Sequence, residues 1–209
     1  MRYLIFFSLL VYWDSTAQGN CKLQSQKDSI KVYTCPVKES KYKAIKVEFL
    51  LNATYTQTVA MLLDIDNLHR WQYKTVSAKL LKKISDNEII YHTEVQTPSG
   101  TNNRDFVIDL SIHQNPNSKE LEIKAISKPN YIPVKKKVVR VPFSEAIWYV
   151  KSVSPGKLSV VYEIKIDFGG EVPAWVVNMV APLAPAETFK AMRAEIGKYK
   201  NSKIGFIVD

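Results

Sequence analysis

The sequence predicts an α+β fold in which a curved antiparallel sheet packs against one long C-terminal helix. Apolar and polar residues alternate through the middle of the chain, turn-forming residues separate these runs, and two helix-like segments interrupt the pattern. A strand with one apolar and one polar face is typical of antiparallel sheets. The short connections between the runs favour a meander.

The N-terminal segment predicts a signal peptide over residues 1–19. MRYLIFFSLLVYW has one Arg ahead of an apolar run, and the small polar residues DSTAQGN follow it. The run is too short to span a bilayer, which takes about 20 apolar residues. A buried N-terminal strand or helix is the alternative. We therefore expect residues 20–209 to form one exported domain, periplasmic or secreted, that is long enough to bury a core.

Two cysteines, Cys21 and Cys35, lie at the start of this mature chain. In an oxidising compartment they could close a short loop, which contributes about 3 kcal/mol on the chain-entropy model. Two separate thiols are the alternative, because sequence alone carries no geometry.

Period-two alternation predicts the strands. The long runs are 43–51, 104–112, 119–127 and 157–168, and shorter strands are expected at 78–84, 88–95, 136–141 and 145–153. The segments SDN, NPNS and SPGK supply turns between them.

Two helices break the alternation. The first is expected over 56–63, where apolar residues recur at helical spacing. The second follows the Gly-Gly pair at 169–170 and has Pro173 in its first turn, where the missing N–H costs nothing. It is expected to run to about residue 200 with kinks at Pro182 and Pro185.

The sizes of these elements predict an uncovered apolar face. Seven strands about 4.8 Å apart make a sheet roughly 30 Å wide, whereas one helix is about 10–12 Å thick. The sheet must therefore curl tightly around its own side chains or enclose a cavity. The segment 172–183 is apolar on nearly every side, with Asn178 as its one polar side chain, which favours a cavity.

Three segments in order resemble the START domain, the lipid-transfer family related to steroidogenic acute regulatory protein. They are TPSGTNNRDFVIDLSI, SKPNYIPVKKKVVRV and VVYEIKIDFGGEVPAWVVNMVAP, and the upstream DSIKVYTCPV, IKVEFLL and LLDIDNLHRWQY fit the same pattern. The resemblance covers Cys21 to Arg193 and is closest to exported bacterial members. It implies a helix-grip fold, with the sheet wrapped around the C-terminal helix and an internal hydrophobic cavity that holds a lipid without covalent chemistry or a cofactor.

The resemblance and the strand register together give a set of candidate site residues. The ligand-binding candidates are Tyr91, Ile108, Leu110, Trp148, Tyr162, Trp175, Asn178, Met179, Val180 and Leu183. Ordinary core packing is the alternative for each apolar residue. Arg104 and Asp105 are expected either to steer a ligand head group or to be structural, with Arg104 in an ion pair or capping backbone carbonyls.

The chain also departs from sterol-binding members of the family. In those members an Arg follows the Arg-Asp-Phe motif on the cavity-facing register and pairs with an acid on an adjacent strand. Here that register continues through Ile108 to Leu110, and Tyr91 lies on the neighbouring strand. This departure counts against a sterol as the ligand. The Trp that often opens the domain is replaced by Cys21.

The sequence contains no recognisable catalytic pattern. His69, His92 and His113 lack metal-ligand spacing, and there is no phosphate-binding loop or nucleophile elbow. We therefore expect a binding protein rather than an enzyme, with no metal. The enzyme alternative is a polyketide-cyclase-like activity in the same pocket, as in related helix-grip proteins. A third reading is an interaction module with a solid core.

The net charge of +9 suits transient contact with an anionic membrane surface. Nucleic acid is not expected as a partner, because the basic residues are scattered along an exported chain. We expect the protein to be a monomer.

Overall fold

The computed structural model describes residues 21–37, 43–98, 100–170 and 174–209, so the predicted signal peptide lies outside it. In chain order the elements are β1 (Lys22–Lys27), β2 (Ile30–Pro36), β3 (Lys43–Leu51), α1 (Tyr55–Leu63), η1 (Ile65–Arg70), β4 (Thr75–Lys83), β5 (Glu88–Val95), β6 (Asn103–Gln114), β7 (Leu121–Ser127), β8 (Val138–Arg140), β9 (Phe143–Ser154), β10 (Lys157–Asp167), α2 (Ala174–Glu195) and η2 (Ile196–Tyr199).

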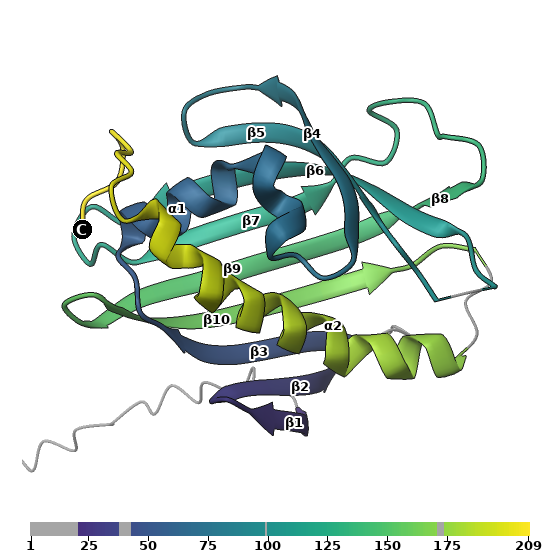
Figure 1. The fold of residues 1–209 in the computed structure, drawn as a ribbon, viewed down its shortest axis with the longest axis horizontal. Coiled ribbons are helices and arrows are strands. Elements are labelled where there is room, and N and C mark those ends of the chain that lie inside the picture. Colours follow the sequence, from purple (N-terminus) through teal and green to yellow (C-terminus); the bar gives the residue numbers. More distant parts are fainter. Residues whose placement is uncertain (1–20, 38–42, 99, 171–173) are drawn as a thin grey trace, which may run out of the picture.

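The described strands form one sheet, ordered β1-β2-β3-β10-β9-β7-β6-β5-β4, with short β8 pairing in parallel alongside β6. The other pairs are antiparallel, and α1 and α2 lie across one face of the sheet (Figure 1). The strands from β4 to β10 follow the predicted meander, apart from β8. β3 does not: it pairs with β10, because α1 and η1 carry the chain from β3 to the far edge.

Two N-terminal strands were not expected from alternation. β1 is exposed along nearly its whole length and has no apolar face, while β2 buries only Ile30 and Val32. A disulfide joins Cys21 to Cys35 across this pair, with the sulfur atoms 2.09 Å apart. The pairing of β2 with β3 attaches both strands to the rest of the sheet.

The alternating strands bury the faces that their sequences predict. Val47 and Leu51 of β3 and Val160 of β10 are fully buried. Tyr162 and Ile164, further along the inward face of β10, are only partly buried although they belong to the same row. The core is therefore dense at one end of the sheet and open at the other.

The two helices close the concave face. Thr54 and Gln57 form a capping box that starts α1, one residue before the expected position. α2 is one continuous helix across Pro182 and Pro185, and Figure 1 shows its axis changing direction partway along. No helix in the described part of the chain is long and apolar enough to cross a membrane.

An aromatic cluster fixes α2 against the sheet. The ring of Phe189, which is 1% exposed, stacks on Phe49 at a centroid distance of 4.5 Å. It also meets Trp148 and Tyr162 edge-on, at 5.3 and 5.2 Å. Aromatic pairs in these geometries stabilise a fold beyond their buried area. Phe189 is therefore the main anchor of the C-terminal half of α2.

Candidate ligand-binding site

A pocket of about 450 Å³ lies between the concave face of the sheet and the helices. Its wall takes side chains from β3, β5, β6, β7, β9, β10, α1, η1 and α2, as well as from three loops. The inward rows of the strands supply most of the wall, because period-two alternation points every second side chain toward it. The pocket thus occupies the part of the concave face where Tyr162 and Ile164 are incompletely covered.

Small side chains on two adjacent strands give the pocket its depth. Ala125 of β7 and Ala146 of β9 are directly opposite in the antiparallel register, and both line the pocket. Trp148 and Tyr162 form a cross-strand pair next to them, with ring centroids 5.0 Å apart. A methyl group in place of a large side chain at two neighbouring positions leaves space that the surrounding aromatics do not fill.

Two tyrosines of the wall, Tyr91 and Tyr162, are held neutral. Burial raises the pKa of the Tyr91 hydroxyl, and it also raises that of Tyr162, with Tyr91 adding a smaller contribution in the same direction. These hydroxyl groups can donate or accept a hydrogen bond without carrying charge.

Polar lining residues gather at one end of the pocket. Arg104 of β6 lies opposite Val95 of β5, which in turn lies opposite Thr75 of β4. The backbone N–H of Gln96 donates to the carbonyl of Lys74 at 2.9 Å, so the loops after η1 and after β5 meet here. The lining residues of these loops are Trp71, Gln72, Tyr73, Lys74, Gln96, Thr97 and Pro98.

Arg104 is buried at this polar end, with 4% of its surface exposed. Its guanidinium donates to the carbonyl oxygen of Asn102 at 2.6 Å and to that of Gly169 at 3.4 Å. Burial lowers the pKa of the Arg104 guanidinium, which nevertheless remains a cation at physiological pH. Arg104 therefore places a positive charge in the wall and connects β6 to the segment before α2.

Two further polar atoms in the wall have no hydrogen-bond partner among the residues that the structure describes. They are the indole nitrogen of Trp71 and the side-chain oxygen of Gln72. Most buried polar side-chain atoms have a partner, so unpaired ones in a pocket call for an explanation.

The predicted site residues fall into three groups. Tyr91, Leu110, Trp148, Tyr162 and Leu183 line the pocket, and so does Arg104. Ile108 is buried on the same face of β6 but belongs to the core rather than to the pocket wall. The side chains of Trp175, Asn178, Met179 and Val180 lie outside the described residues.

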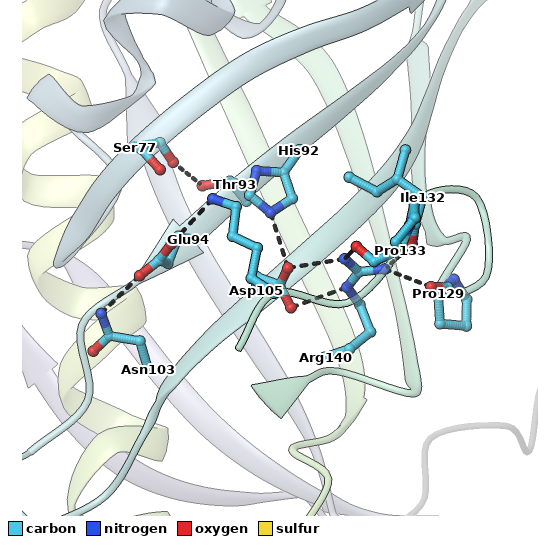
Figure 2. Close-up of polar contacts among 11 residues, drawn as sticks. Ser77, His92, Thr93, Glu94, Asn103, Asp105, Pro129, Ile132, Pro133 and Arg140 are labelled. Carbon is cyan, nitrogen blue, oxygen red and sulfur yellow. Dashed lines mark hydrogen bonds and ion pairs between the residues drawn. The ribbon is translucent and has the colours of Figure 1, made fainter. Parts of the chain in front are cut away.

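Asp105 points away from the pocket, because neighbours along a strand face opposite sides. Its carboxylate accepts two hydrogen bonds from Arg140, both at 2.9 Å, and lies 2.9 Å from Nε2 of His92 (Figure 2). Burial alone would raise the pKa of this carboxyl, but the hydrogen bonds from Arg140 and His92 outweigh it and keep the pKa below its ordinary value. Asp105 is therefore a structural residue and not a head-group ligand.

The same network holds the loop between β7 and β8 against the outer face of the sheet. Arg140 also donates to the backbone carbonyls of Pro129, Ile132 and Pro133 (Figure 2). Gly169 lies against the backbone of Arg140. It has a φ of +65°, and a Cβ at this position would lie 2.9 Å from Pro142 Cδ. Glycine is thus required where the chain turns from β10 toward α2.

Several wall residues were not expected from the sequence. Phe189 and Thr188 of α2 and the loop residues Trp71, Gln72 and Lys74 carry no periodic signal that separates a pocket wall from a core. The loop is nevertheless tied to the helix, since the backbone N–H of Tyr73 donates to the Thr188 hydroxyl. Across the described chain, no group of three or more His, Cys, Asp or Glu side chains could hold a metal ion.

A curved antiparallel sheet closed by a terminal helix over an apolar pocket defines a class of α+β ligand-pocket domains. The START domain family model matches residues 13–202, and the chain therefore belongs to the START domain family. This confirms the family that the sequence resembles.

Similar proteins share most of the chain. The uncharacterized protein PA1579 of Pseudomonas aeruginosa is 29% identical over 178 residues, covering 85% of this chain and 87% of that protein. The crystal structure of a STAR-related lipid transfer protein fragment from Xanthomonas axonopodis is 25% identical with a TM-score of 0.77, covering 85% of this chain and 98% of that one. Human STARD10, at 21% identity and a TM-score of 0.73, covers 86% and 74% and shows the same fold.

Proposed function

We propose that this protein binds a lipid or other hydrophobic small molecule in the pocket without covalent chemistry, as a helix-grip carrier. The observation that carries the proposal is the pocket of about 450 Å³ between α2 and the inward row of the sheet. Pockets for small molecules have volumes of about 300–1,000 Å³ and predominantly apolar walls. Transfer of apolar ligand surface from water would drive binding, at about 25 cal/mol per Å² before ordering costs.

Filling the pocket should block uptake of an apolar ligand. Replacing Ala125 with Phe places a ring over the Ala125–Ala146 pair, so affinity for the neutral dye N-phenylnaphthylamine should fall at least about tenfold, roughly 1.4 kcal/mol. Dye fluorescence measures affinity, and thermal unfolding measures stability. Lys124→Phe is the matched control, because Lys124 is exposed on the outer face one residue away.

Two results would count against a ligand pocket. One is a wild-type protein that takes up no dye and yields no co-purifying lipid in native mass spectrometry. The other is an Ala125→Phe variant that is destabilised by about 1–3 kcal/mol, the cost of overpacking an interior that is already filled.

The enzyme alternative is a polyketide-cyclase-like activity, which needs polar groups that face the ligand. The wall has them in Gln72, Lys74 and Arg104, but the described lining residues include no His, Asp, Glu or Cys. Acid–base chemistry would then depend on Lys74 or on the hydroxyls of Tyr91 and Tyr162, whose pKa burial raises. This lining favours binding over catalysis. The third alternative, an interaction module with a solid core, requires a cavity below about 300 Å³. The pocket of about 450 Å³ is larger than this limit.

Export, a monomeric state and membrane contact complete the proposal. The Cys21–Cys35 disulfide supports an oxidising compartment, where such bonds persist.

For membrane contact the best placed surface is the β7–β8 loop, which Figure 1 shows extending beyond the sheet. It exposes Tyr131 and Val134 next to the three lysines at 135–137. Exposed apolar side chains flanked by lysines suit an anionic bilayer surface.

Neutralising this loop should weaken binding to anionic vesicles. Each lysine near such a surface contributes about 1 kcal/mol, so changing Lys135, Lys136 and Lys137 to Gln should reduce binding strongly. The assay is co-sedimentation with phosphatidylserine-containing vesicles, compared with phosphatidylcholine alone. Changing the exposed lysines at 198, 200 and 203 to Gln alters net charge equally. Equal losses in both triple variants would show that net charge, and not this loop, governs binding.

A further inference from the structure

We infer that Arg104 binds the anionic head group of the ligand, so that the pocket takes a single-chain amphiphile with a carboxylate or phosphate at one end. This inference rests on the proposed function and specifies its ligand class. Its basis is a buried cation in the wall of an otherwise largely apolar pocket.

The charge of Arg104 has no counter-ion in the described part of the chain. No carboxylate there lies within ion-pairing distance of its guanidinium, and none of the described lining residues is Asp or Glu. Burial lowers the pKa of the Arg104 guanidinium. Burying a charge is costly unless it is paired, and the neighbouring Asp105, on the opposite face, is already paired with Arg140.

The geometry leaves donors for a ligand. A guanidinium has five N–H groups in a fork that matches a carboxylate or phosphate. Among the described residues, Arg104 bonds to two backbone carbonyls, those of Asn102 and Gly169. The indole N–H of Trp71 is buried in the same pocket wall and is unpaired among the described residues. Lys74, exposed at the polar end, adds a second cation there.

The rest of the wall fits an apolar tail. From Arg104 the wall continues through Phe106 and Leu110 of β6 to the aromatic side chains of Trp148 and Phe189. The pocket's volume of about 450 Å³ lies within the range of small-molecule pockets. One medium-length chain fits a pocket of this size.

The test compares ligands that share a tail and differ in the head group. Dodecanoate, dodecyl phosphate and the neutral dodecanol each displace the bound neutral dye N-phenylnaphthylamine from the wild-type protein near neutral pH. We expect at least one of the two anions to bind about tenfold to a hundredfold more tightly than dodecanol, because hydrogen bonds to charged groups are strong. The ranking of dodecanoate and dodecyl phosphate identifies the head group.

Variants then assign the preference to Arg104. Arg104→Gln should remove the anion preference, measured as the ratio of the affinity for each anion to the affinity for dodecanol in the same variant. Arg193→Gln is the matched control, because Arg193 also donates to backbone carbonyls but does not line the pocket. Arg104→Lys, which keeps the charge and loses the fork, should show an intermediate preference and serves if Arg104→Gln does not fold.

The outcomes separate the two proposals. Equal displacement by all three ligands, or an anion preference that persists in Arg104→Gln, overturns the role of Arg104 while dye binding leaves the carrier function standing. A wild-type protein that binds neither dye nor any of the three ligands overturns both.

Discussion

Replacing Phe189 with Ala is expected to lower the free energy of unfolding by about 3–5 kcal/mol, the range for deleting a fully buried aromatic ring. Phe189 is 1% exposed and contacts Phe49, Trp148 and Tyr162, so its removal leaves a cavity between α2 and the sheet. Urea denaturation followed by circular dichroism measures the change.

Tyr149→Ala is the control for this prediction. Tyr149 neighbours Trp148 on β9 but faces outward and is 45% exposed, so its loss should change stability by less than about 1 kcal/mol. If Phe189→Ala cost no more than Tyr149→Ala, the aromatic cluster would not be what holds α2 on the sheet. The Phe189 variant should also release bound dye, because the same ring forms part of the pocket wall.

Replacing Asp105 with Asn is expected to cost about 3–5 kcal/mol at neutral pH, because it leaves Arg140 as a buried charge without its partner. Asp105 is fully buried, and Arg140 and His92 are nearly so. Asp109→Asn is the control. Asp109 also faces outward on β6, but its partner Lys128 is half exposed at 3.3 Å, and exposed pairs contribute less than about 1 kcal/mol.

The Asp105 contribution should depend on pH in a defined direction. The pKa of this carboxyl is lower in the folded protein than its ordinary value of about 3.9. The stability that ionised Asp105 contributes is therefore present above about pH 4, and it is lost as the pH falls through the lowered pKa of Asp105 in the folded protein. The difference in unfolding free energy between wild type and Asp105→Asn should be largest near neutral pH and shrink at acidic pH. A difference that does not change down to the acid transition would contradict the ionised pair.

Local sequence pattern predicts much of this fold. Strands such as β3 and β10 have one buried and one wetter face, which is what alternation reports. β1 gave no such signal, because KLQSQK lies at the edge of the sheet and buries no face. The pairing of β3 with β10 also lay beyond reach, since nothing local in either strand identifies a partner so distant in the chain.

The candidate site was predictable only in part, for a similar reason. Alternation separates inward from outward side chains, so Tyr91, Leu110 and Tyr162 could be placed on the pocket side. It cannot tell a core position from a wall position on the same row, and Ile108 differs from Leu110 in just that way. The partners of Asp105 come from β5 and β8 and meet it only through the fold.

The pairing of β3 with β10 has a consequence for how the protein reaches its native state. Ile45, early in the chain, becomes a neighbour of Ile164 only after nearly every other strand has been made. Contacts between such distant segments slow folding, because the ends of a long loop must be brought together first. β1, β2 and β3 can pair with one another as soon as they are made, but β3 lacks its neighbour β10 until synthesis has passed the last strand, so closure of the sheet is a late step in folding.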